Sequence, residues 1–398
     1  MARIFGTSRT APPVQVWAYV LVVLISSRSL FMGVGALAAT LLPGADPAGD
    51  PLEPAGFLNY WAHWDGAWYS EIATRGYGAR APESTAFFPL YPLFVRSGIS
   101  LVGGPAVWGV LISLLCTAFA LYFVYRIAEN LYGAGAARAS TLALAFFPTA
   151  FFLNAVYTEA LFLALTAGAV WAARVRGNLL LAGLFGALAT ASRNLGVLLL
   201  IPLCLEWVRR RQTFGLRGLA GLAVVPSGLV AYALFLRQRF GDPLVFASQQ
   251  SAYWERELTG PLTTLGRAWR DAGAGMKYVL DPPALFLGAP AGPSLEASNT
   301  LNLVFLVFFL LVVLVGFVVL PQDLSVYTAL VVLLPVLTPA PQFPLMSLPR
   351  FVLGAFPVFL VLGYLLSRSR LALVSYLVLA GGLGIALTAL FTTWRWVA

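Results

Sequence analysis

Long apolar runs recur along almost the whole sequence, and they constrain the fold more than any other feature. A straight helix needs about 20 predominantly apolar residues to cross the hydrocarbon core of a membrane. The chain offers many such windows, from residues 16–42 to residues 371–392. Only 10% of its 398 residues are charged, against about 25% in an ordinary soluble domain. These features exclude a water-soluble protein and predict an all-α polytopic membrane protein.

The polar breaks between the apolar runs predict about eleven transmembrane helices in one integral membrane domain, residues 1–398. The predicted spans are 16–42, 105–125, 139–153, 159–173, 179–192, 195–208, 218–236, 301–320, 324–338, 350–366 and 371–392. By the positive-inside rule, the loops with Arg174 and Arg176 and with Arg209 to Arg211 face the cytoplasm. The N-terminus, with Arg3 and Arg9, then also lies inside. We expect a multi-pass protein of the cell membrane.

Two loops on the outside are long, residues 43–104 and 240–300, and loops of this length are more often functional than idle. Four predicted spans between residues 139 and 208 are too short to cross about 30 Å as straight helices. They predict two helical hairpins. The apices of these hairpins, residues 154–159 and 192–194, face the outside or stop within the outer leaflet.

Residues 57–76 read FLNYWAHWDGAWYSEIATRG and predict an amphipathic helix in the membrane interface. At 3.6 residues per turn its tryptophans share one face, and tryptophan is favoured at the interface. Asp65 projects from this face, whereas His63 points to the polar side. A carboxyl group that is desolvated without a partner is poised to take up a proton, so Asp65 is the candidate catalytic base. The alternative is that Asp65 caps a break at Gly66 between two short helices.

Several short motifs follow one another between residues 61 and 357. They are Trp64-Asp65-Gly66 with Trp68-Tyr69, Phe87-Phe88-Pro89-Leu90-Tyr91-Pro92, Tyr157-Thr158-Glu159, Ser192-Arg193-Asn194, Gly241-Asp242-Pro243-Leu244 with Gln249 and Trp254, and Ser347 to Pro357. This series resembles the glycosylphosphatidylinositol mannosyltransferase family of the PIG-V type, in its bacterial branch. The resemblance implies a GT-C glycosyltransferase fold, a polyprenyl-phosphate sugar as donor, mannose as the sugar and inversion at the anomeric carbon. The acid of the family pattern falls on Asp65.

The expected reaction is a single in-line displacement at the extracytoplasmic face. Asp65 removes the proton from an acceptor hydroxyl while polyprenyl phosphate departs. Arginine suits the departing phosphate because its planar guanidinium binds phosphate oxygens in pairs. Arg193 is the first candidate, and its alternative role is a structural ion pair with Glu159. Arg350 is the second candidate, and its alternative is snorkelling to the interface.

Further predicted substrate contacts are aromatic or polar: Trp64, Trp68, Tyr69, Tyr91, Tyr157, Glu159, Asn194 and Gln249. Capping of the hairpin apex is the alternative for Glu159 and the preferred interpretation of Asn154. In the second long loop, Asp242, Trp254 and Arg256 either cover the acceptor or are solvated.

The sequence indicates no cofactor. Its single histidine and two cysteines do not cluster with zinc-ligand spacing. The sequence does not exclude a divalent cation bound by carboxylates, although it contains no Asp-X-Asp pair. The basic residues lie at the ends of apolar runs and do not form a patch, so nucleic acid is not an expected partner. The expected partners are the donor, membrane lipids and an unidentified acceptor.

A lipid or solute transporter is the main alternative function. Arg28, Arg193 and Glu159 would then mark a translocation path. The repeated halves that are typical of transporters are not evident in the sequence.

Overall fold

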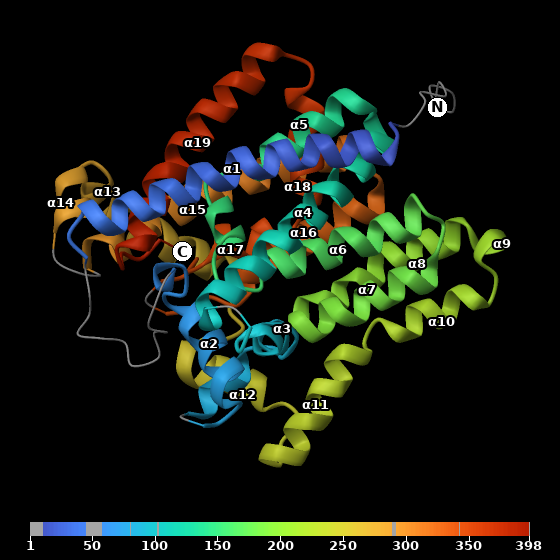
Figure 1. Ribbon diagram of the computed structural model, residues 1–398, viewed down its shortest axis with the longest axis horizontal. Helices are drawn as coiled ribbons and strands as arrows, with labels where there is room; N and C mark the ends of the chain where they lie inside the picture. The colour runs from blue at the N-terminus through green and yellow to red at the C-terminus, as the bar shows by residue number, and fades with distance from the viewer. Residues whose placement is uncertain are drawn as a thin grey trace.

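The computed structural model describes residues 11–44, 58–79, 81–101, 103–288, 292–341 and 343–397, and these residues form helices without any strand (Figure 1). The α-helices are α1 (Pro13–Leu41), α2 (Asp65–Arg75), α3 (Leu90–Gly98), α4 (Gly104–Tyr132), α5 (Ala134–Ala145), α6 (Glu159–Arg174), α7 (Leu179–Ser192), α8 (Leu200–Arg209), α9 (Arg211–Phe214), α10 (Arg217–Val224), α11 (Ser227–Phe240), α12 (Val245–Trp254), α13 (Pro261–Val279), α14 (Pro282–Leu287), α15 (Gly292–Val319), α16 (Gln322–Leu337), α17 (Leu348–Leu353), α18 (Pro357–Leu366) and α19 (Arg370–Thr392). Short 3-10 helices are η1 (Asn59–Trp61), η2 (Pro82–Ala86), η3 (Ala150–Leu153) and η4 (Asn194–Leu199). The predicted all-α fold is confirmed.

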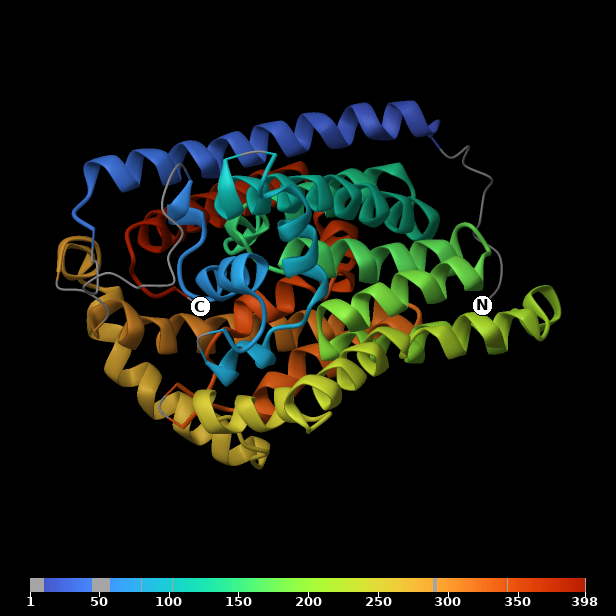
Figure 2. The ribbon, with the colours of Figure 1, turned by 60° about the horizontal axis from the view of Figure 1, so that its bottom comes forward.

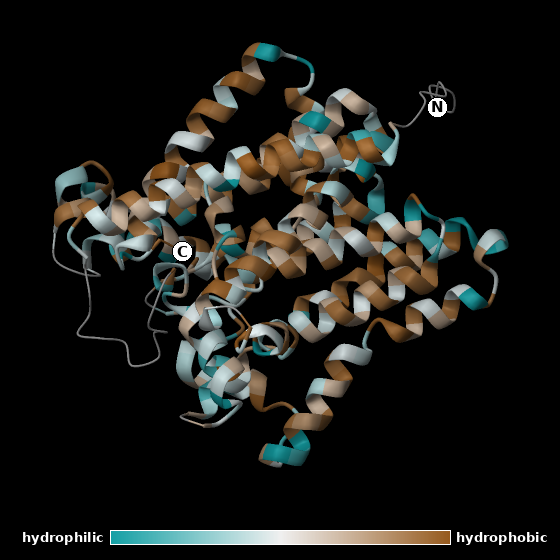
Figure 3. Ribbon diagram, in the orientation of Figure 1, coloured by the Kyte–Doolittle hydropathy of each residue, from teal (hydrophilic) through white to brown (hydrophobic). Residues whose placement is uncertain are grey.

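Within the described residues, four helices are long and apolar enough to cross a membrane: α1, α4, α15 and α19. Helices α10 and α11 together could form one more span, bent by 40° at Val225 and Pro226. Proline cannot donate the hydrogen bond that a continuous helix requires, and it therefore favours this break. Apolar residues run along the long helices (Figure 3). The chain is a multi-pass membrane protein, as its sequence predicts.

The other six predicted spans correspond to shorter or interrupted helices. Helix α6 has 16 residues and α7 has 14, which agrees with the expectation of helices too short to span. Helix α5 ends at Ala145, shortly before Phe147 and Pro148, and the residue before a proline disfavours helical geometry. All eleven apolar segments are therefore present. Among the described residues, only the helices of the preceding paragraph are both long and apolar enough to cross a membrane.

Helix α6 is buried along almost its whole length and connects two clusters of charged side chains. Its first residue is Glu159 and its last is Arg174, about 22 Å apart at 1.5 Å per residue. At the Arg174 end, the Asp323 carboxylate accepts from Arg174 at 2.6 Å and from Arg209 at 2.7 Å. The positive-inside rule places Arg174 and Arg209 in cytoplasmic loops, and the structure brings both of them to Asp323. Arg3 and Arg9 lie outside the described residues.

Helix α1 lies along one face of the bundle (Figure 2), and the buried Arg28 fastens it to the segment after α5. The guanidinium of Arg28 donates to the carbonyls of Ala145 at 2.6 Å and Ala150 at 2.5 Å, and to Oδ1 of Asn154 at 3.1 Å. Asn154 therefore accepts from Arg28, and its predicted role as a helix cap is wrong. Because three acceptors satisfy Arg28, this arginine has a structural explanation.

Candidate active site

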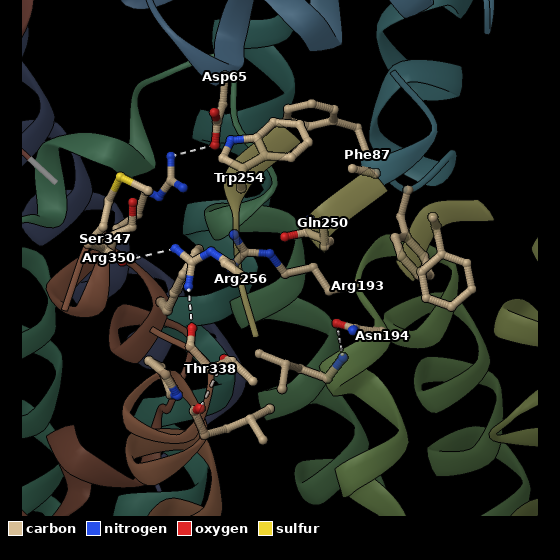
Figure 4. A pocket seen from close by; sticks show the side chains of 18 of the residues that line it. Asp65, Phe87, Arg193, Asn194, Gln250, Trp254, Arg256, Thr338, Ser347 and Arg350 are labelled. Carbon is tan, nitrogen blue, oxygen red and sulfur yellow. Dashed lines mark hydrogen bonds and ion pairs between the residues drawn. The ribbon is translucent and has the colours of Figure 1, made fainter. Parts of the chain in front are cut away.

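A cavity of about 320 Å³ lies beside the Glu159 end of α6. Its walls come from α2, from the segment after η2, from the junction of α7 and η4, from α12, from the end of α16 and from α17 (Figure 4). The charged residues of this wall are Asp65, Arg193, Arg256 and Arg350. The cavity thus gathers one acid and three arginines that lie far apart in the sequence.

The helix around Asp65 differs from the prediction. The structure has η1, then a break, then α2, which starts at Asp65. Trp64 at the break has φ 56° and ψ −120°, a strained conformation for a residue with a side chain. The predicted single amphipathic helix is therefore wrong, and so is the predicted polar face for His63. That residue is only 3% exposed, and its ring centroid lies 4.2 Å from that of Trp394.

The packing of Gly66 explains how Asp65 is placed at the cavity. A Cβ atom at position 66 would lie 3.3 Å from both the carbonyl oxygen of Val156 and the ring of Tyr157. The N–H of Val156 donates to the carbonyl of Trp61 at 2.9 Å, and the hydroxyl of Tyr157 donates to that of His63 at 2.8 Å. The hairpin apex and the first loop are therefore fastened together immediately before Asp65.

Asp65 is the terminal residue in a chain of ion pairs. Its Oδ2 lies 2.6 Å from Nη1 of Arg350, Nε of Arg350 lies 3.5 Å from Oε1 of Glu159, and the same Oε1 accepts from Arg193 at 2.8 Å. The side chain of Glu159 is fully buried, that of Arg350 is 7% exposed, and that of Asp65 is 23% exposed. The acid is paired, so the condition under which the sequence predicted an unfavourable desolvation of Asp65 is not met. Arg350 does not snorkel to a surface, and neither carboxylate acts as a helix cap.

Arg193 combines the two roles that the sequence left open. It pairs with Glu159, as the structural alternative required, and it also lines the cavity. Its Nη1 is buried and has no hydrogen-bond partner among the described residues. This nitrogen therefore keeps a hydrogen-bond donor that no described group uses.

Arg256 is the third cation of the cavity and has no carboxylate partner in the described part of the chain. It donates to the carbonyls of Thr338 at 3.2 Å and Met346 at 3.1 Å. Its guanidinium carbon lies 5.3 Å from the centre of the Phe351 ring, which also contacts the other two arginines. Removal from water, together with the nearby Arg350, lowers the pKa of Arg256 to about 10, so this residue is a cation at neutral pH. With Glu159 included, the cluster has three cations and two anions.

The structure also places the other predicted substrate contacts. Tyr69 and Asn194 line the cavity together with Asp65, Arg193 and Arg350. Those that are not among its lining residues are Trp64, Trp68, Tyr91, Tyr157, Glu159 and Gln249. Tyr91 is fully buried and donates to the carbonyl of Gly109 at 3.0 Å, which explains it as a packing residue. Trp68 packs on Phe87 with ring centroids 5.8 Å apart.

The sequence did not predict two residues of the cavity wall, Gln250 and Trp396. The neighbour of Gln249 on α12, Gln250, lines the cavity, and adjacent residues of a helix point about 100° apart. Trp396 lines the cavity as well, and no motif in its vicinity indicated this. The sequence left open whether Arg256 covers the acceptor or is solvated, and the structure places it in the cavity wall. The described residues contain no group of three or more His, Cys, Asp or Glu side chains that could hold a metal ion.

One family model matches part of the chain. Residues 83–225 match the family described as dolichyl-phosphate-mannose-protein mannosyltransferase. The helical fold and the apolar spans define a multi-pass membrane protein, and this match supports the expected glycosyltransferase class. The matched segment includes Glu159 and Arg193 but not Asp65. It covers well under half of the chain, so the chain is similar to this family over that segment.

Distant likeness to solved structures extends over nearly the whole chain. The oligosaccharyltransferase of Archaeoglobus fulgidus has a TM-score of 0.48 and 13% identity, and the match covers 94% of this chain and 53% of that one. This chain thus spans about half the length of that protein. ArnT from Cupriavidus metallidurans bound to undecaprenyl phosphate has a TM-score of 0.43 and 15% identity, with 95% and 77% covered. No curated protein sequence matches the chain.

Proposed function

We propose that the protein is an inverting glycosyltransferase that moves a sugar, expected to be mannose, from a polyprenyl-phosphate carrier to an acceptor hydroxyl. The proposed location is the extracytoplasmic face of the plasma membrane. The observation that carries this proposal is the presence of Asp65 in one cavity with three arginines, one of which is its ion-pair partner. The description of the matched family, which names dolichyl phosphate mannose, supports the carrier and the sugar.

In the proposed reaction, Asp65 acts as the base. Arg350 holds Oδ2 at 2.6 Å, which leaves Oδ1 to accept the proton of the acceptor hydroxyl. The acceptor oxygen bonds to the anomeric carbon while the bond from that carbon to the phosphate oxygen breaks. The electron pair of the broken bond goes to the phosphate. Attack from the side opposite the leaving phosphate inverts the anomeric carbon.

Charge balance supports a carrier with a single phosphate. Three arginines and two carboxylates give the cluster one net positive charge, and a sugar linked to a polyprenyl monophosphate has one negative charge. During the reaction Asp65 gains a proton and the leaving phosphate gains a negative charge, so the site and its ligand stay neutral together. A diphosphate carrier would bring a further negative charge, which is costly to hold away from water.

The test uses a labelled polyprenyl-phosphate mannose with the purified protein in detergent. Asp65→Asn keeps the shape of the side chain and removes its basicity, and we expect transfer to fall by about 10²-fold or more. Folding is checked by thermal unfolding and elution volume. Wild-type turnover in a folded Asp65→Asn protein would refute the role of Asp65. Detergent micelles sustain no gradient, so product formation in them also distinguishes the enzyme from a transporter.

A further inference from the structure

The segment Thr393–Val397, which follows α19, joins both long loops at the cavity. The ring of Trp394 packs on that of Trp64 with centroids 5.1 Å apart. Trp394 has a φ of 63°, a value that is uncommon for a residue other than glycine. The contact fixes this segment against the residue that precedes Asp65.

Arg395 anchors the same segment on its other side. It is only 2% exposed, and it donates to the carbonyls of Pro43 at 3.0 Å and Gly288 at 3.3 Å and to the hydroxyl of Thr393 at 2.9 Å. The backbone N–H of the next residue, Trp396, donates to Oγ of Ser294 at 2.9 Å. Contacts from several distant parts of the chain therefore determine the position of Trp396.

Trp396 is a wall of the cavity that contains Asp65. Its ring packs edge to face on Trp64, with centroids 4.9 Å apart and an interplanar angle of 81°. Its Nε1 is buried and has no hydrogen-bond partner among the described residues. A ligand hydroxyl that reached Nε1 would satisfy this donor.

The ion pairs show on which side of the cavity an acceptor would lie. Arg193 and Asp65 are the two ends of the chain of ion pairs that runs through Glu159 and Arg350. In an in-line displacement, the departing phosphate and the attacking hydroxyl lie on opposite sides of the anomeric carbon. A phosphate at Arg193 therefore places the hydroxyl at Asp65. The remainder of the acceptor would then lie near Trp396.

An indole ring has a flat apolar face and one hydrogen-bond donor at its edge. A sugar ring presents the complementary groups, C–H bonds on one face and hydroxyls around its edge. Accordingly, we propose that Trp396 forms an acceptor subsite and that the acceptor is a hydroxyl-bearing sugar ring. This proposal rests on the proposed function. A serine or threonine in a peptide lacks such a ring and would make no comparable use of Trp396.

The experiment compares transfer to octyl α-mannoside with hydrolysis of the labelled donor by water. Trp396→Phe keeps a ring against Trp64 and removes the N–H, and Trp396→Leu removes the ring as well. We expect Trp396→Phe to raise the KM for octyl mannoside about tenfold, because one hydrogen bond of about 1.4 kcal/mol corresponds to that factor. The ratio of transfer to hydrolysis should fall with it, and further in Trp396→Leu. Trp269→Phe, at an exposed tryptophan of α13, is the matched control and should keep both values.

The outcomes separate the subsite from the proposed function. An unchanged KM and an unchanged ratio in folded Trp396→Phe would overturn the subsite, and this variant decides the question if Trp396→Leu does not fold. Preference for a serine- or threonine-containing peptide over octyl mannoside, with no effect of Trp396, would overturn it too. Wild-type transfer in Asp65→Asn would instead overturn the proposed function. If Asp65→Asn is inactive but the Trp396 variants keep the wild-type KM and ratio, the subsite is refuted and the proposed function stands.

Discussion

Arg256→Gln tests the charge balance of the cavity directly. The change leaves two cations and two carboxylates, so the net positive charge that matches a monophosphate is lost. A hydrogen bond to a charged group contributes about 1.5–3 kcal/mol. Since about 1.4 kcal/mol is a factor of ten, we expect the donor KM to rise between about tenfold and about 150-fold. The loss of the bonds to Thr338 and Met346 should lower the thermal midpoint only slightly, because glutamine can replace one of them.

The assay measures initial rates of transfer against the concentration of labelled polyprenyl-phosphate mannose, with the acceptor at saturation. Arg270→Gln is the control, because Arg270 is an exposed arginine on α13 and its replacement changes the net charge of the same loop equally. The control should keep the donor KM of the wild type. A donor KM within about twofold of the wild-type value in folded Arg256→Gln would refute the charge argument, because the loss of a charged hydrogen bond to the phosphate should change this KM by about tenfold or more.

Three further changes test other parts of the structure. Gly66→Ala forces a Cβ atom against the Val156 carbonyl; we expect a loss of about 1–3 kcal/mol in stability, seen as a lower thermal midpoint, together with slower turnover. Asp323→Asn removes the buried partner of Arg174 and Arg209; it should cost about 3 kcal/mol in unfolding experiments, while the donor KM of the remaining folded protein stays at its wild-type value. As pH rises through about 10, Arg256 loses its proton, so the donor KM of the wild type should rise there and that of Arg256→Gln should not.

The sequence predicted the helical membrane fold and the ends of several helices well. Apolar runs and arginine positions are local features, and α7 begins and ends at the predicted residues 179 and 192. The positive-inside rule placed Arg174 and Arg209 on the same side of the membrane, but their shared contact with Asp323 is visible only in the structure. The motifs also predicted Asp65, Arg193 and Arg350 as site residues, and the structure brings these three together.

The errors in the sequence analysis have a common physical cause. Helical periodicity at residues 57–76 assumed one continuous helix, but the break at Trp64 depends on contacts with residues near 156 and 394. The pairing of Asp65 with Arg350 joins residues nearly 300 positions apart, and no local pattern indicates such a partner. The choice of Gln249 instead of Gln250 reflects the rotation of α12, which is determined by packing on other segments.

The two ends of α6 show why the candidate site lies at the Glu159 end. Both clusters contain three arginines and two carboxylates, so their net charge does not distinguish them. At the Arg174 end, the side chains of Arg209 and Arg210 are 40% and 38% exposed, and the small pocket described there has no room for a water-sized ligand. Water therefore stabilises the excess positive charge. At the other end, Arg193 and Arg350 are 13% and 7% exposed beside a cavity of about 320 Å³. There the excess positive charge lies beside a cavity large enough for an anion, which would neutralise it.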